Sequence, residues 1–327
     1  MLRCRSGIVL LSAMLVACLP ASALESDQYY AWGRELDDAT DLLNAKVRLE
    51  IDRLLIELNA RASRPKCEKV AKRIGVHFKQ LIFHEIEIWA ANSSLVPRIP
   101  ATAEEELTFT DRYLYRHTHL LDYGTKVPPS PTIELNGVRL GTDKLSHFFS
   151  EGYWYFRWYL NKRGSKRTPE ELERWILRRG IVWERTILGL LSSGVFSIGD
   201  LEANYQGLQF FIGLCEGDSP ALVEGETGWS YVGEFDFRDY VTPEWDESYQ
   251  PVIFGRRRWK KVRPALREYC PMLTDPWVVE QRRVYALADR VTPNVRIVKE
   301  LIDAGKLRDP RRFALEANCD ESAGRND

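Results

Sequence analysis

An aromatic segment that carries regularly spaced ionisable residues constrains this chain more than any other feature. Residues 141–156 read GTDKLSHFFSEGYWYF, and Asp143, His147 and Glu151 recur at every fourth position. On an α-helix these three side chains fall within an arc of about 80° and share one face. The other positions are apolar or aromatic all around, which is typical of a buried helix. Because buried ionisable groups need partners, we expect them to meet one another, Lys144, a metal or a substrate.

The N-terminus has the pattern of a secretory signal peptide. Two arginines precede an uncharged run over residues 7–19, and Pro20 is followed by Ala-Ser-Ala. The run is too short to cross a bilayer, and no later segment approaches the roughly 20 apolar residues that a helical span needs. We therefore predict a signal peptide over residues 1–23, with cleavage before Leu24. The alternative is a lipoprotein, because Cys18 follows a Leu-Val-Ala sequence that resembles a lipobox and would carry a lipid anchor.

Charge and length limit the classes of partner and the number of domains. The chain has 46 Lys and Arg and 47 Asp and Glu, and loss of two arginines with the signal peptide leaves a net charge of −3. This balance does not favour a nucleic-acid partner. Because the chain has no Pro/Gly/Ser-rich linker and no internal repeat, we predict a single helical domain over residues 24–327.

Four cysteines follow the predicted signal peptide, namely Cys67, Cys215, Cys270 and Cys319. An even number suits an oxidising compartment, and we predict two disulfides. The spacing selects none of the three ways to pair them. Free buried thiols are the alternative.

Hydrophobic periodicity predicts a mainly α fold, a compact multi-helix bundle with one short β-hairpin and a long ordered loop. An Asn-Gly turn within residues 132–140 predicts the hairpin. The proline-containing residues 92–131 predict irregular chain, with one helical or extended piece near residues 111–121. Residues 216–255 predict the ordered loop, with a short strand at 232–237. We expect helices over residues 26–62, 67–91, 141–164, 168–193, 197–215, 256–269, 276–289 and 293–304.

Two further helices carry polar residues among apolar neighbours. Glu184 lies in the helix expected over residues 168–193, and Asp200 and Asn204 lie in the next one. Short connections make consecutive helices neighbours in space. We therefore predict one cluster that contains Asp143, Lys144, His147, Glu151, Glu184, Asp200 and Asn204.

A divalent metal is one ligand that this cluster suits, since imidazole and carboxylate groups on adjacent helices form metal sites in helical bundles. The predicted metal ligands are His147, Glu151, Glu184 and Asp200.

Acid–base catalysis is the second chemistry that the cluster suits. His147 would be the general base, with Glu151 and Glu184 as its carboxylate partners. Lys144 would stabilise developing negative charge, and Asp143 would orient the other groups.

Each of these residues also has a structural explanation. Asp143 stands at a helix start, where the helix dipole favours an acid. Asp200 follows Ser197 by three residues, which is the spacing of a capping box. His147 and Glu151 could form an internally satisfied core pair. The sequence leaves the functional and the structural interpretations open.

Other histidines give weaker candidates for metal sites. His77 and His84 lie seven residues apart on one expected helix face, with Glu87 nearby. Residues 117–122 contain two more histidines and an aspartate. For both groups the alternative is ordinary hydrogen bonding at the edge of the core or at the surface.

The motif formed by Asp143, Lys144, His147 and Phe148 is similar to the D-K-x-x-H-F signature of VanZ-like proteins and of some bacterial envelope lipoproteins. Residues 141–156, Glu184 and residues 193–204 also resemble a family of secreted bacterial envelope proteins. The resemblance implies an envelope setting and a role for the first three residues of the motif. VanZ-like proteins are integral membrane proteins, whereas this sequence predicts no span after the signal, so the resemblance carries over no activity.

Two hypotheses of function follow. The first is an exported bacterial envelope protein with a non-catalytic binding or structural role, whose polar cluster holds helices in register and whose loop at 216–255 binds a partner. The second is a periplasmic hydrolase, metal-assisted or general acid–base, that acts on an envelope glycan, peptide or lipid. Both place the protein in the periplasm or at the outer membrane, with a cell-envelope component or another protein as its partner.

Export is directly testable from the N-terminal pattern. Intact-mass analysis of protein purified from its native host should show a chain that starts at Leu24, or a diacylglycerol-bearing Cys18. A mature protein that retains Met1 would rule out export through this signal.

Overall fold

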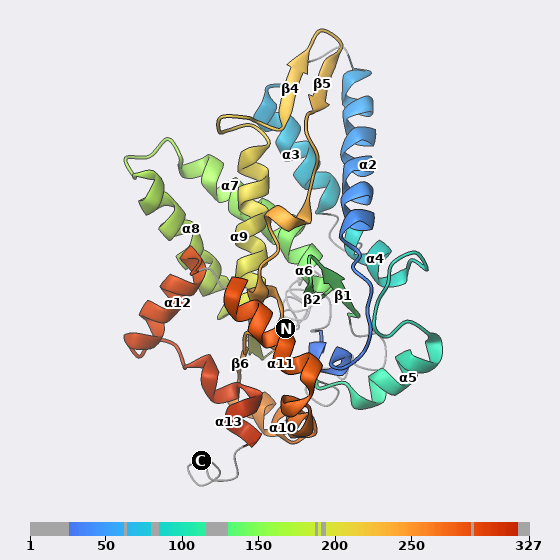
Figure 1. Cartoon of the computed structure of the whole chain (residues 1–327). Coiled ribbons are helices and arrows are strands. Elements are labelled where there is room, and N and C mark those ends of the chain that lie inside the picture. Colours follow the sequence, from blue (N-terminus) through green and yellow to red (C-terminus); the bar gives the residue numbers. More distant parts are fainter. Residues whose placement is uncertain are drawn as a thin grey trace, which may run out of the picture.

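Figure 1 shows the computed structural model of the chain, in which helices surround a central pair, α7 and α9. The structure describes residues 26–61, 64–79, 85–115, 130–186, 189–190, 194–288 and 291–319. Its main helices are α2 (Thr40–Asn59), α3 (Cys67–Phe78), α4 (Glu85–Asn92), α5 (Ala103–Arg112), α6 (Asp143–Ser146), α7 (Gly152–Lys162), α8 (Pro169–Glu184), α9 (Ile198–Gly213), α10 (Arg256–Arg267), α11 (Pro276–Ala288), α12 (Pro293–Asp303) and α13 (Leu315–Cys319). The predicted mainly α fold is confirmed.

Glycines allow the central helices to approach each other closely. α7 and α9 lie side by side in Figure 1. A Cβ atom on Gly207 would collide with the backbone oxygen of Phe148, and one on Gly152 would lie 2.7 Å from the Cα of Gly207. No larger residue fits at either position without moving backbone, so this contact requires glycine on both helices. The surrounding aromatic core includes Phe148, Phe149, Phe210, Phe211, Phe235 and Phe237.

The helix expected over residues 141–164 forms in three parts, with a π-helical turn, η3 (His147–Glu151), between α6 and α7. A π turn holds one residue more than an α turn, so it rotates the residues that follow by about 100°. Trp154 and Trp158, which an uninterrupted α-helix would place beside His147, pack against Trp183 of α8, with ring centroids 6.4 and 4.9 Å away. The π turn therefore separates the polar part of this helix from its aromatic part.

Short antiparallel strand pairs complete the described part of the fold. β1 (Thr132–Leu135) and β2 (Val138–Gly141) form the predicted hairpin, and the positive φ angles at its Asn-Gly turn, 53° and 71°, are those a type I′ turn requires. The long loop at 216–255 is more structured than expected. It carries β4 (Leu222–Gly225), β5 (Gly228–Tyr231) and β6 (Ile253–Phe254), and β6 pairs with β3 (Val195–Phe196). The strand expected at 232–237 does not form.

Several helix boundaries differ from the expected ones. The helix expected over residues 26–62 begins only at Thr40, after the short 3-10 helix η1 (Gln28–Ala31) and a stretch without helix. Asp38 pairs there with Glu134 of β1 and accepts a hydrogen bond from the backbone N–H of Thr40 at 2.7 Å, so sheet pairing holds the residues before the helix. The stretch expected over 67–91 contains two helices, α3 and α4, and α8 ends before residue 193.

One helix, α5, forms where prolines predicted irregular chain. Its N-cap residue Thr102 accepts a hydrogen bond from the backbone N–H of Glu105 at 3.2 Å. Three glutamates in its first turn suit the helix dipole. The capping signal therefore outweighs the prolines, which lie outside the helix.

Two disulfides cross-link the fold and select one of the three pairings. Cys67–Cys215 joins the start of α3 to the chain just after α9, across 148 residues of sequence. Cys270–Cys319 joins the 3-10 helix η6 (Cys270–Thr274) to α13, across 49 residues. Within the described residues, no helix is long and apolar enough to cross a membrane.

Loss of either disulfide should lower the free energy of unfolding, and the longer loop should cost more. In the chain-entropy model, loops of this length are worth about 4–5 kcal/mol, and measured values are typically about 2–4 kcal/mol. Urea unfolding should show a larger loss for the Cys67→Ala/Cys215→Ala variant than for Cys270→Ala/Cys319→Ala. Free alkylation of all four thiols in the native protein would contradict the pairing.

Candidate functional site

A fully buried lysine lies at the centre of the candidate site. The side chain of Lys144 on α6 has 0% exposed surface. Its Nζ lies 2.8 Å from Asp143 Oδ2, 2.8 Å from Asp200 Oδ1 and 2.9 Å from Glu247 Oε1. An ammonium group has three N–H donors, so each of them can meet one carboxylate. These contacts join α6, the start of α9 and the segment after the 3-10 helix η5 (Pro243–Trp245).

Two serines add hydrogen bonds to the same carboxylates. Ser26 Oγ donates to Asp143 Oδ1 at 2.5 Å, and Ser197 Oγ donates to Glu247 Oε1 at 2.5 Å. Ser197 is also the N-cap of α9, where its Oγ accepts a hydrogen bond from the backbone N–H of Asp200 at 3.0 Å. The buried charges are therefore hydrogen-bonded as well as paired, which burial in a low-dielectric interior requires.

His147 occupies the more open side of this cluster, with 19% of its side chain exposed. Asn204 donates through Nδ2 to the hydroxyl of Tyr155 at 3.5 Å, so its Oδ1 faces His147 Nδ1 at 3.1 Å. His147 Nε2 lies 3.3 Å from Asp200 Oδ2. Burial alone would lower the pKa of His147, but the Asp200 and Glu151 carboxylates outweigh it and raise that pKa to about 9. At neutral pH both ring nitrogens are therefore protonated and face acceptors.

The structure brings five of the seven predicted cluster residues into direct contact, namely Asp143, Lys144, His147, Asp200 and Asn204. Glu184 instead accepts the backbone N–H of Ser197 through Oε1 at 3.1 Å, which positions the start of α9. Glu151 lies half-buried on the π turn, where burial raises its pKa and the His147 charge opposes that rise. Catalytic or metal-binding roles for these residues stay predictions.

Glu247 is the member of the cluster that the sequence did not single out. It lies in the buried run Glu244-Trp245-Asp246-Glu247-Ser248. Three acidic residues beside a tryptophan in one ordered loop were a usable signal of burial and pairing. Lys144 and Glu247 are 103 residues apart in sequence, however, so no local pattern connects them.

Three residues of the cluster have a geometry that could hold a metal ion, but such an ion would compete with the Lys144 ammonium group for Asp143. Asp143, His147 and Asp200 each offer one ligand atom, and these atoms lie within 4.8 Å of one another. Such a set suits a divalent ion. Ser26 and Lys144 already contact the two oxygens of Asp143, and an ammonium group repels a second cation at this distance. The set also lacks the two glutamates that were predicted as ligands.

Another buried carboxyl approaches the cluster from α4. Glu87 Oε2 accepts a hydrogen bond from Ser146 Oγ on α6. Burial raises the pKa of Glu87 to about 8, against the opposing effect of that hydrogen bond. The sequence grouped Glu87 with His77 and His84, but Glu87 contacts Ser146, and His84 lies outside the described residues. The histidines and the aspartate of residues 117–122 also lie outside them.

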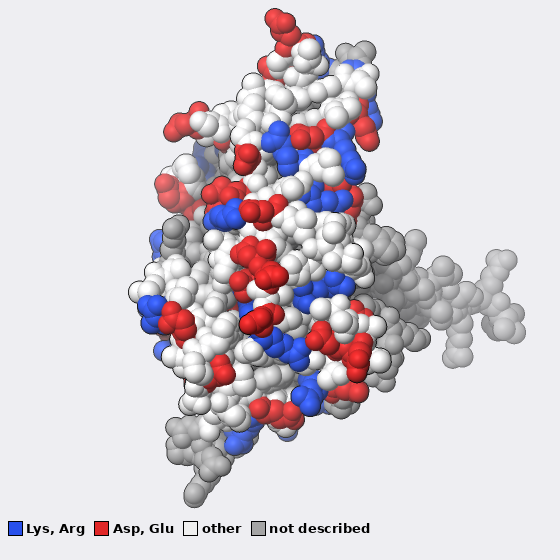
Figure 2. Space-filling model, turned by 45° about the vertical axis from the view of Figure 1, so that its right-hand side comes forward, with Lys and Arg blue, Asp and Glu red and all other residues white. Residues whose placement is uncertain are grey.

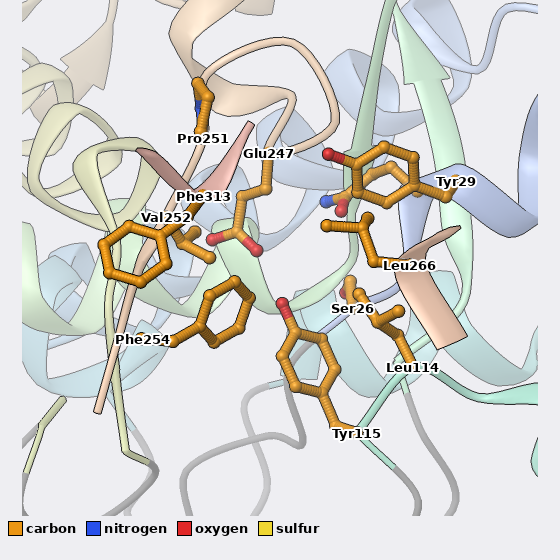
Figure 3. Close-up of a pocket in the computed structure, with 11 residues that line it drawn as sticks. Ser26, Tyr29, Leu114, Tyr115, Glu247, Pro251, Val252, Phe254, Leu266 and Phe313 are labelled. Atoms are coloured by element: carbon orange, nitrogen blue, oxygen red, sulfur yellow. The ribbon is translucent and has the colours of Figure 1, made fainter. Parts of the chain in front are cut away.

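A small pocket reaches the cluster at Glu247. Figure 3 shows the Glu247 carboxylate pointing toward the space between the rings of Tyr115 and Phe254. The cavity volume is about 10 Å³, which is room for about one water molecule. This pocket has room for about one water molecule beside Glu247 but no space for a larger ligand.

Comparison of the chain with family models, with curated proteins and with solved structures finds no match.

The raised pKa of Glu87 should make stability depend on pH. Above its ordinary pKa of 4.5 the unfolded chain loses the proton, whereas the folded protein keeps it up to about pH 8, so stability falls as pH rises between these values. A tenfold difference in proton affinity between the folded and unfolded chain corresponds to about 1.4 kcal/mol, so the loss is on the order of a few kcal/mol. The free energy of unfolding should be measured in urea at pH 5, 6.5 and 8. It should fall less between pH 5 and pH 8 for Glu87→Gln than for the wild type.

Glu106→Gln is the matched control, since Glu106 is an exposed glutamate on α5. It should leave the pH profile of the wild type unchanged. A Glu87→Gln profile as steep as that of the wild type would contradict a protonated Glu87.

Proposed function

We propose that this protein is an exported bacterial envelope protein that acts by binding, and that its buried Asp–Lys–His–Glu cluster holds the binding framework together. The observation that carries the proposal is that both cations of the cluster contact acceptor groups of the protein itself. Lys144 is surrounded by three carboxylates, and His147 faces an amide oxygen and a carboxylate.

The protonation state of His147 argues against its use as a general base. A general base works best when its pKa lies near the working pH and its free nitrogen faces the substrate. The pKa of about 9 keeps His147 protonated at neutral pH, and Asn204 and Asp200 face its two nitrogens. The contact between His147 and Asp200 is instead that of a stable ion pair.

Export is supported by two independent features. The N-terminus has the pattern of a signal peptide, and both disulfides would persist only in an oxidising compartment. The D-K-x-x-H-F resemblance adds an envelope setting. Together they favour the periplasm or the periplasmic face of the outer membrane, with a lipid anchor at Cys18 if the lipobox-like sequence is used.

The partner surface that we propose is the part of the loop at 216–255 that carries β4 and β5. This hairpin projects at the end of the molecule beside α2 and α3 in Figure 1. Val223 and Val232, which lie in it and just after it, are 42% and 46% exposed. Exposed apolar side chains on a projecting hairpin suit contact with an envelope component or another protein.

A hydrolase remains the second candidate, because one observation favours it. His147 and Glu151 lie on a π turn, a feature that often occurs at functional sites. Two carboxyl groups near that turn, Glu87 and Glu151, have pKa values raised by burial and could serve as general acids. This hypothesis places the reaction on the open side of His147, with a glycan, peptide or lipid of the envelope as substrate.

Substitution of the two cations of the cluster tests the proposal, and the histidine variant separates the two candidates. Lys144→Met leaves three buried carboxylates without their cation, so we expect a loss of about 3–5 kcal/mol in the free energy of unfolding at pH 7. His147→Ala should cost about 1–3 kcal/mol, because it leaves Asp200 and Asn204 without this partner. Metal content by elemental analysis should be the same in wild type and His147→Ala.

Lys162→Met, on the exposed end of α7, is the matched control and should change stability by less than about 0.5 kcal/mol. The hydrolase becomes the better account if His147→Ala keeps wild-type stability while it abolishes hydrolysis of peptidoglycan or phospholipid, or removes a bound metal.

A further inference from the structure

A second group of ionisable side chains lies on the helices that precede the central pair. Glu50 on α2, His77 on α3 and Glu85 at the start of α4 each offer one ligand atom, and these atoms lie within 4.8 Å of one another. His77 Nε2 lies 3.4 Å from Glu50 Oε2 and 3.7 Å from Glu85 Oε2. The group is distinct from the Lys144 cluster in both residues and helices.

Neighbouring cations orient both carboxylates of this group. Lys46 Nζ lies 2.7 Å from Glu50 Oε1 and 3.2 Å from Glu85 Oε1, and Arg53 lies 3.0 Å from Glu50 Oε1. Because the cations hold the Oε1 atoms, the Oε2 atom of each carboxylate is directed toward His77. Outer partners of this kind fix the orientation of metal ligands in known sites.

The contacts of His77 point to a ligand rather than to a simple hydrogen bond. Its Nε2 atom is enclosed by protein, and the two carboxylate oxygens that face it lie at 3.4 and 3.7 Å, beyond the usual N–H···O distance of about 2.7–3.2 Å. Neighbouring ligands of a tetrahedral ion with bonds of about 2.0–2.2 Å lie roughly 3.4 Å apart. The two oxygens lie at 3.4 and 3.7 Å from this nitrogen, which is the spacing of ligands around a shared ion.

We propose that Glu50, His77 and Glu85 bind one divalent transition-metal ion of the Zn²⁺ class, with solvent as the remaining ligand. An imidazole nitrogen and carboxylate oxygens are ligand types that such an ion accepts, and three protein ligands with solvent in the fourth position are the arrangement of an open zinc site. The side chains are 4%, 24% and 36% exposed, so the site opens to solvent at its histidine and Glu85 end.

The charges around the site limit its affinity. Lys46 and Arg53 lie beside the carboxylates and oppose a second cation. Figure 2 shows acidic and basic side chains interspersed over one face of the molecule. Because these two cations reduce the electrostatic attraction for a metal ion, affinity must come from coordination itself. We therefore expect a dissociation constant on the order of 1–100 µM. The bound ion would link α2, α3 and α4, independently of the proposed function.

Zinc titration of the full chain tests the site. After chelator treatment and dialysis, calorimetry with Zn²⁺ alone should show one ion per wild-type chain. His77→Ala and Glu85→Gln should each weaken the affinity at least ten-fold. Glu57→Gln, an exposed glutamate on the same helix as Glu50, is the matched control and should bind as the wild type does.

Circular dichroism should first establish that each variant is folded, and if His77→Ala is not, Glu85→Gln decides alone because Glu85 is the most exposed of the three side chains. Absence of saturable binding by the wild type would overturn the proposal. Unchanged affinity in either ligand variant would overturn it too, since the ion would then lie elsewhere, for example at Asp143, His147 and Asp200.

Discussion

The burial of one ammonium group, that of Lys144, sets the conditions that the rest of the structure must meet. Transfer of an ion from water to a protein interior costs several kcal/mol even after relaxation. For Lys144 this cost is offset only if three carboxylates reach its Nζ. Asp143, Asp200 and Glu247 do so at 2.8, 2.8 and 2.9 Å. These carboxylates come from α6, α9 and the loop after η5, so the lysine fixes three elements relative to one another.

The backbone around the lysine is shaped to make this arrangement possible. The glycines of α7 and α9 let the helices touch, which brings the start of α9 to α6. His147, at the start of the π turn, meets Asp200 and Asn204, and the turn rotates the tryptophans that follow toward α8. The polar cluster and the aromatic core can therefore lie on one continuous helical segment without conflict.

The first described residues of the chain close the cluster from another side. Ser26 donates to Asp143, and the residues that follow are buried against the β1–β2 hairpin region. Arg139 of β2 holds this segment through the backbone oxygens of Ala31 and Arg34, the latter at 2.6 Å, and stacks on Trp277 of α11. The chain from Ser26 to Trp32 is thus part of the core, and its first described residue contributes a hydrogen bond to the cluster.

The local features of the fold were determined by the sequence alone. An Asn-Gly turn with positive φ gave the β1–β2 hairpin, Thr168 and Glu171 formed a capping box at the start of α8, and the four cysteines formed two disulfides. Each of these signals acts through backbone conformation or composition over a few residues, or through a simple count. The helical spacing also identified Asp143, His147 and Glu151 as residues that must find partners, with Lys144 as one expected partner.

Only the tertiary structure decided which partners these were. Ser26 and Asp143 are 117 residues apart, and Lys144 and Glu247 are 103 apart, so their pairing depends on how whole elements pack. The same packing accommodates the π turn, which ideal helical periodicity does not predict. It also places Glu87 against Ser146, whereas the sequence grouped Glu87 with His77. Hydrophobic patterns show that a polar residue is buried, but the atoms that compensate its charge are chosen by contacts between distant parts of the chain.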